Sequence, residues 1–306
     1  MHTYIHSYIY REESLREAGF TDIFREIKQK ENNNALDLLP AVLAEVDAQP
    51  TPQARWDMVI RGICAANIFD LGTIHTSEMY HNEGGVSFHA TREKLVPRPW
   101  AIDCLDALIA RLVDATIGTK NTIYKKALLF VDNSGADIVL GMLPFARELL
   151  KGGVAGEVVI AANTLPSIND ITAAELDEML PRVAACDDFL CKCVSSRRLR
   201  VVPSGNDLPV IDLRLVSDEV VEEAGDADFV VLEGMGRGIE TNLNAEFSAR
   251  CDALKIGMVK HPEVATAMNC RLLDCVVKFD HNIGGRNGSE AGDGEAQQKK
   301  TRCCMM

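Results

Sequence analysis

The chain has 306 residues, with 45 acidic and 32 basic side chains and a formal net charge of −13 at pH 7. This acidity argues against a nucleic-acid-binding surface, because binding a phosphate backbone requires a basic face. Hydrophobic residues make up 47% of the chain, as in ordinary soluble globular proteins. The ten cysteines follow no zinc or disulfide spacing, so we expect reduced, packed thiols in a cytoplasmic protein.

Residues 1–125 are predicted to form a helical domain. Apolar residues recur at helical spacing over four stretches, 11–30, 34–47, 55–70 and 101–117. Pro40 is expected to mark a kink or a junction in the second stretch, because proline disrupts a helix interior. Nothing in this part of the chain has the alternation of a half-buried strand.

Residues 126–281 change character, with short apolar runs alternating with helical patterns. The runs are 127–132, 157–163, 199–204, 228–234, 254–260 and 272–280. Apolar runs without alternation suit strands buried on both faces, and strand–helix alternation implies parallel crossovers. We therefore predict an α/β fold, a three-layer αβα sandwich with a mostly parallel sheet, followed by a flexible, glycine-rich tail over 282–306.

Chemistry is expected at one rim of this sheet, because ligands bind beyond the carboxyl ends of parallel strands. Carboxylates, amides, glycines and basic side chains follow the predicted strands. They are Asp132, Asn133, Asn163, Asp170, Glu233, Gly234, Gly236, Arg237 and Lys260. The chain contains neither a P-loop nor a nucleophile elbow, which argues against P-loop NTPases and α/β-hydrolases.

Asp132 and Asn133 offer two hard oxygen ligands at the end of a buried strand, which suits Mg²⁺ or Mn²⁺. The alternative is a strand-to-helix turn with side-chain capping. Asp170 is either a third ligand or part of a helix start, because Thr172 and Glu175 have the spacing of a capping box.

The predicted strand before Glu233 is followed by a glycine-rich turn suited to an anion. Gly234 and Gly236 allow the backbone to approach a ligand, and Arg237 can bind a phosphate with two hydrogen bonds. Lys260 is a second candidate phosphate contact. The alternative is a tight turn with basic side chains exposed to solvent.

Asn67 and Asp70 interrupt an apolar helical face and share one side of the helix. They either cap the end of that helix or close the site from the helical domain. We include both in the candidate substrate-binding set, together with Asn163, Glu233, Gly234, Gly236, Arg237 and Lys260.

The segments FVDNSGAD, NTLPSINDIT and EGMGRG, in this order, resemble the metal-dependent damage-control phosphatase family, and EGMGR is the signature of its subfamily II. The resemblance implies an N-terminal helical domain packed on an αβα sandwich. It also implies that Asp132, Asn133 and Asp170 hold a divalent metal (Mn²⁺, Co²⁺, Ni²⁺ or Mg²⁺). The implied activity is hydrolysis of phosphate monoesters, with 4′-phosphopantetheine and its oxidised or sulfonate forms as substrates.

The partner expected from this resemblance is a small phosphorylated metabolite. In the mechanism that we expect, Arg237 stabilises the phosphoryl oxygens, and Asp132 is either a metal ligand or the nucleophile. Two other functional classes remain open at this point. One is an S-adenosylmethionine-dependent protein carboxyl methyltransferase, and the other is a non-catalytic binding module.

The last four residues, Cys303 to Met306, fit a prenylation box of the farnesyl type. Lys299, Lys300 and Arg302 form a basic cluster before it. One prenyl chain plus a basic cluster is a workable reversible membrane anchor. The alternative is an unstructured tail with incidental cysteines.

Overall fold

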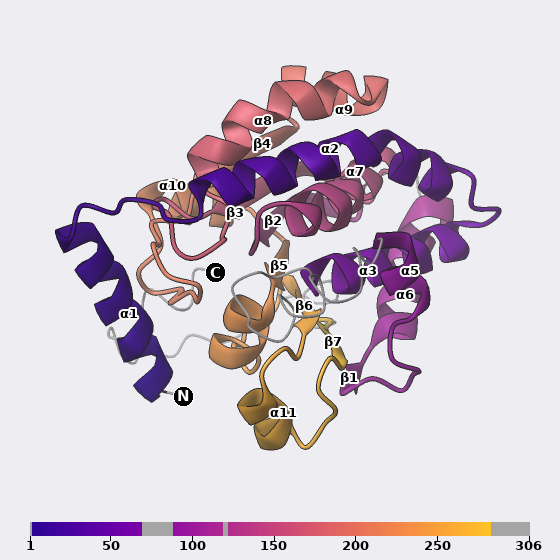
Figure 1. Ribbon diagram of the computed structural model, residues 1–306. Helices are drawn as coiled ribbons and strands as arrows, with labels where there is room; N and C mark the ends of the chain where they lie inside the picture. The colour runs from indigo at the N-terminus through magenta and orange to yellow at the C-terminus, as the bar shows by residue number, and fades with distance from the viewer. Residues whose placement is uncertain (1, 69–87, 119–121, 283–306) are drawn as a thin grey trace, which may run out of the picture.

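The computed structural model describes residues 2–68, 88–118 and 122–282 (Figure 1). Its centre is a seven-stranded sheet with the order β1-β7-β6-β5-β2-β3-β4. The strands are β1 (Ile102–Asp103), β2 (Tyr124–Phe130), β3 (Ala155–Ala162), β4 (Leu199–Pro203), β5 (Phe229–Glu233), β6 (Asp252–Met258) and β7 (Cys275–Asp280). Only β7 and β6 pair antiparallel within the described sheet, so the predicted α/β fold with a mostly parallel sheet is confirmed.

Helices cover both faces of this sheet. They are α1 (His2–Glu17), α2 (Arg25–Asp47), α3 (Pro52–Asn67), α5 (Phe88–Glu93), α6 (Leu105–Gly118), α7 (Leu143–Lys151), α8 (Ala173–Ala185), α9 (Asp188–Ser195), α10 (Asp218–Ala224) and α11 (Pro262–Met268). Two π-helical segments, η1 (Asp137–Met142) and η2 (Met235–Thr241), follow β2 and β5.

The strands explain the layers, because successive side chains point to opposite faces of a sheet. In β2, Leu129 packs with the apolar faces of α2, α3, α6, α7 and α8 in the larger core cluster. Leu128 and Phe130 point the other way and pack with α10. Both faces are therefore apolar, which is why these runs lack alternation in the sequence.

All six apolar runs of the sequence form strands, but three details differ from the sequence-based expectations. β1 was not expected, because a two-residue strand is too short to show a period. The predicted helix over 11–30 is divided between α1 and α2, and Gly19 between them has φ +87, a conformation that ends helices. Pro40 lies inside α2 and is not a helix junction.

The helices of residues 1–125 do not form a separate core. Buried side chains of α2, α3 and α6 belong to the same hydrophobic cluster as the strands β2, β3, β5 and β6. This packing brings the end of α3 to the rim of the sheet (Figure 1).

The described residues contain eight cysteines, all of them free thiols. Among the helices that the structure describes, none has the length and apolar character needed to cross a membrane.

Candidate active site

The carboxyl ends of β2, β3, β5 and β6 meet at one rim, as the sequence predicted. Asp132 lies two residues after β2, and Asn163 directly follows β3. Glu233 is the last residue of β5, and Lys260 lies two residues after β6. All four side chains are buried although they are polar or charged, so their hydrogen bonds and charges must be matched within the protein.

Arg237, in η2, joins the two loops on which the candidate metal ligands lie. One of its amino groups, Nη1, donates to Asp132 Oδ1. The other, Nη2, donates to Asp170 Oδ2 at 2.7 Å and to Asn163 Oδ1 at 2.9 Å. One guanidinium therefore brings the carboxylates of Asp132 and Asp170 together at the rim of the sheet.

Backbone pairing places Asp170 beside Asn133. The two residues form an isolated antiparallel bridge, and Ile171 N donates to Asp132 O at 3.0 Å. The capping box between Thr172 and Glu175 is also present. Asp170 therefore lies two residues before the N-cap of α8. Its carboxylate does not cap the helix but accepts a hydrogen bond from Arg237.

Asp132 also belongs to a cluster of three buried carboxylates. Oxygen atoms of Asp132, Asp137 and Glu233 lie within 4.8 Å of one another, and all three residues are buried. Asn67, at the end of α3, donates to Asp137 Oδ2 and to Glu233 Oε1, both at 2.8 Å. Asn133 donates to Asp132 Oδ2 at 3.0 Å and to Asp137 Oδ2 at 2.9 Å.

Burial and mutual repulsion shape the protonation of this cluster. Burial, together with the charge of Asp132, raises the pKa of Asp137 to about 6. Burial and the charges of Asp137 and Asp132 also raise the pKa of Glu233 well above its usual value. Lys260 Nζ lies 3.9 Å from Asp132 Oδ2 and only partly offsets this negative charge.

The donor set fits a hard divalent cation. It consists of carboxylate and amide oxygens, which Mg²⁺ and Mn²⁺ prefer. Asp137 Oδ1 is buried and has no hydrogen-bond partner among the described residues, which is costly unless a cation uses that oxygen. Asp132 belongs both to this carboxylate cluster and to the predicted set with Asn133 and Asp170.

Two glycines of the EGMGRG segment are required by close packing. Gly234 has φ +95, and a Cβ there would lie 2.3 Å from Asp132 Oδ2. A Cβ on Gly236 would lie 2.1 Å from the carbonyl oxygen of Pro209. Their predicted role in presenting N–H groups to an anion stays a prediction.

A model of the damage-control phosphatase ARMT1-like domain matches residues 1–276 of the chain. The chain belongs to this family. The sequence-based resemblance is therefore confirmed, and so is the assignment as a phosphatase, that is a hydrolase. The comparisons support this interpretation over the methyltransferase and over the non-catalytic binding module.

The chain is also similar in sequence to individual proteins that include a damage-control phosphatase. The chain is 52% identical over 270 residues to a damage-control phosphatase of Arabidopsis thaliana, covering 88% of this chain and 70% of that protein. It is 41% identical to pantothenate kinase 2 of Arabidopsis thaliana and 31% identical to 4′-phosphopantetheine phosphatase of Mus musculus, each over 88% of this chain. The chain spans about a third of the length of these two, 32% and 37%.

The fold also recurs in a solved structure. A crystal structure of a DUF89 family protein from Pyrococcus horikoshii aligns with a TM-score of 0.60, covering 91% of this chain and 81% of that one. At 20% sequence identity this likeness shows the fold alone.

The structure of this damage-control phosphatase gathers almost the whole predicted site. Two predicted positions, Asp70 and Cys303, lie outside the described residues. Asp137 was not predicted as a site residue. It is the second aspartate of FVDNSGAD, five residues after Asp132. The sequence alone does not show that η1 places this side chain beside Asp132 and Glu233.

Proposed function

We propose that this phosphatase hydrolyses phosphate monoesters with the help of a divalent cation held at Asp132, and that its substrate is 4′-phosphopantetheine or an oxidised form of it. The observation that carries the proposal is the bridge from Arg237 to Asp132 and Asp170. It gathers hard anionic ligands and a fixed cationic group at the rim where ligands of parallel sheets bind.

The substrate class is supported by the names of two relatives. The mouse relative is a 4′-phosphopantetheine phosphatase, and the plant relative of similar overlap is a pantothenate kinase. Both names concern derivatives of pantothenate. A role in removing damaged intermediates of coenzyme A synthesis follows from this substrate class.

Asp132, Asn133 and Asp170 would hold the cation, with Asp137 and Glu233 adding negative charge behind Asp132. When bound, such a cation neutralises a phosphate oxygen and lowers the pKa of a bound water. Because the donors are oxygen atoms, we propose Mn²⁺ or Mg²⁺ as the ion, with Co²⁺ and Ni²⁺ as further candidates.

The chain itself supplies positive charge and orientation. Arg237 is held by Asn163 Oδ1, and Lys260 is held by the backbone carbonyl of Asn67 at 3.1 Å. Their charges stabilise the oxygens of the transferred phosphoryl group. In this proposal Asp132 is a metal ligand, and Arg237 and Asn133 orient its carboxylate by contacting Oδ1 and Oδ2.

The test is a phosphate-release assay with the full chain after removal of bound metal with EDTA. The substrates 4′-phosphopantetheine, its disulfide and sulfonate forms, and simple sugar phosphates are compared side by side with Mn²⁺, Co²⁺, Ni²⁺ or Mg²⁺. We expect metal-dependent release that is fastest with a phosphopantetheine. Faster turnover of sugar phosphates than of phosphopantetheines would refute the proposed substrate class. Equal rates of phosphate release with EDTA and with added metal would refute the requirement for a cation.

A further inference from the structure

Helix α2 reaches both loops that bear the proposed metal ligands, through two side chains one turn apart. Lys28 Nζ donates to the backbone carbonyl of Asp170 at 3.5 Å. Asn32 Oδ1 accepts from the backbone N–H of Gly135, two residues after Asn133, at 2.6 Å. Residues four apart share one face of a helix, so a single rigid face of α2 contacts both loops.

Lys28 is an unusual residue to bury. Its side chain is fully enclosed, and it pairs with Asp22 Oδ2 at 3.0 Å and with Glu175 Oε1 at 2.7 Å. With Asp170 O, these contacts use all three protons of the ammonium group. Because an apolar side chain would be easier to bury, such a network indicates a requirement for precise placement.

The same network fixes the chain directly after Asp170. Glu175 Oε2 accepts from the backbone N–H of Thr172 at 2.9 Å, while its Oε1 pairs with Lys28. The first turn of α8 and the loop before it are thus attached to α2. The carboxylate of Asp170 lies on that loop.

The turn after Asn133 is held just as closely. Gly135 has φ +73, and a Cβ at this position would lie 2.9 Å from Glu31 Cβ. The backbone of the turn therefore packs directly on α2, with Asn32 accepting its N–H.

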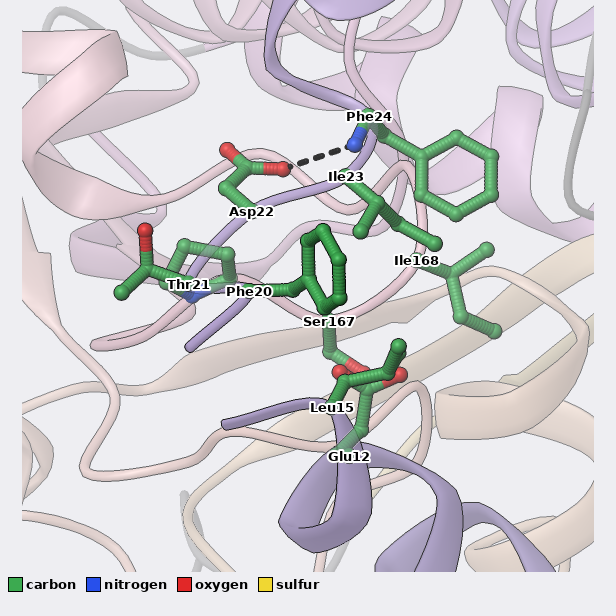
Figure 2. Close-up of a pocket in the computed structure, with 10 residues that line it drawn as sticks. Glu12, Leu15, Phe20, Thr21, Asp22, Ile23, Phe24, Ser167 and Ile168 are labelled. Atoms are coloured by element: carbon green, nitrogen blue, oxygen red, sulfur yellow. Dashed lines mark hydrogen bonds between the residues drawn. The ribbon is translucent and has the colours of Figure 1, made fainter. Parts of the chain in front are cut away.

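Helix α1 and the segment between α1 and α2 support the Asp170 loop from behind. Figure 2 shows a small pocket there, lined by Leu15, Phe20 and Ile23 of this N-terminal part and by Ser167 and Ile168 of the Asp170 loop. Ile168 has φ +47, an unfavourable conformation for a branched residue, which persists only where packing enforces it.

We propose that Lys28 and Asn32 are positioning residues that hold the loops 132–137 and 163–172 at the separation required for one cation. This inference rests on the proposed function, because it takes those loops to be the metal-bearing ones. Lys28 acts through the backbone carbonyl of the proposed ligand Asp170, and Asn32 acts through the backbone N–H of Gly135, two residues after the proposed ligand Asn133. Loss of a contact that orients a ligand typically weakens metal affinity by about 10–100-fold.

The test is Mn²⁺ binding to the full chain by isothermal titration calorimetry, with melting temperature as a second readout. We expect Asn32→Ala to weaken Mn²⁺ affinity by about tenfold or more, with little change in the melting temperature of the EDTA-treated protein. Asn32→Asp keeps an acceptor for Gly135 and should restore the affinity. Excess Mn²⁺ should return kcat of Asn32→Ala to the wild-type value, because the ligands themselves are intact.

Asn33→Ala is the matched control, because the neighbouring Asn33 is exposed and accepts a hydrogen bond from Arg182 of α8, at 2.5 Å. For Lys28, the double variant Lys28→Met with Asp22→Asn removes the ammonium without leaving Asp22 buried and unpaired, and it should also weaken Mn²⁺ binding. Equal affinities of Asn32→Ala and Asn33→Ala would overturn the positioning role. A wild-type protein that binds no Mn²⁺ would instead overturn the proposed function.

Discussion

Gly234 lies so close to Asp132 that no side chain fits between the glycine and the carboxylate. A Cβ at Gly234 would stand 2.3 Å from Asp132 Oδ2 and 2.7 Å from Asp132 Cβ. The first glycine after β5 thus sets the position of the carboxylate after β2, the strand that pairs with β5. The link between the EGMGRG and DNSGAD segments is a direct steric contact.

Gly234→Ala should displace the Asp132 carboxylate and greatly reduce phosphatase activity. It should also lower stability by more than the about 1–3 kcal/mol of backbone strain alone, because φ +95 with ψ 159 is almost restricted to glycine and the added Cβ would collide with Asp132. Gly153→Ala is the control, because Gly153 has φ +69 but a Cβ there would meet no atom of the described residues within 4 Å. We expect both variants to melt at lower temperature and only Gly234→Ala to lose activity, measured by phosphate release.

Arg237→Met should destabilise the EDTA-treated protein by about 3–5 kcal/mol, because the carboxylates of Asp132 and Asp170 then lose their buried cation. Added Mn²⁺ should recover part of this loss, since a bound cation would compensate the same carboxylates. The measurement is denaturant unfolding with EDTA and with Mn²⁺. Arg200→Met, which removes pairs with Glu223 and Glu157 away from the site, should show no such rescue.

Mn²⁺ affinity should rise with pH between about 5 and 7, because Asp137, with a pKa of about 6, adds its negative charge beside the proposed ligands only after it loses its proton. The folding stability of the metal-free protein depends on pH in the opposite direction. The pKa of Asp137 is raised from 3.8, so its stabilising contribution is present below that value and is lost as the pH rises through 6.

Asp137→Asn should therefore stabilise the EDTA-treated protein at pH 7.5, on the order of 1–3 kcal/mol, and flatten the pH dependence of Mn²⁺ binding. Calorimetric titrations at several pH values, with unfolding curves at the same values, check both parts. A steep pH dependence that persists in Asp137→Asn would assign the titration to another group.

The residues at the rim of the sheet were predictable because their placement depends on apolar runs in the sequence and on the rule that parallel strands end at the same edge. Apolar runs indicated the strands, and parallel strands carry Asp132, Asn163 and Glu233 to the same edge. Asp137 and Lys28 were not predictable in this way. Nothing in the sequence distinguishes them from ordinary charged residues, and only tertiary packing buries them.

The direction of β7 is a second case. Its apolar run is the same as that of a parallel strand, and the antiparallel pairing with β6 depends on how the segment 259–274 turns. The role of Asn67 does not follow from the sequence for a similar reason. Its contacts with Asp137 and Glu233 arise only because α3 packs on the sheet and ends at the rim.

In the proposed reaction, Asp132 holds the cation used in phosphate-ester hydrolysis. The most direct measurement is phosphate release from 4′-phosphopantetheine by Asp132→Ala, with Mn²⁺ or Co²⁺ added in excess and the fold checked by circular dichroism. The exposed carboxylate variant Asp106→Ala serves as control. We predict a folded Asp132→Ala protein with turnover at the background level, whereas near-normal turnover of that variant would show that Asp132 does not hold the cation.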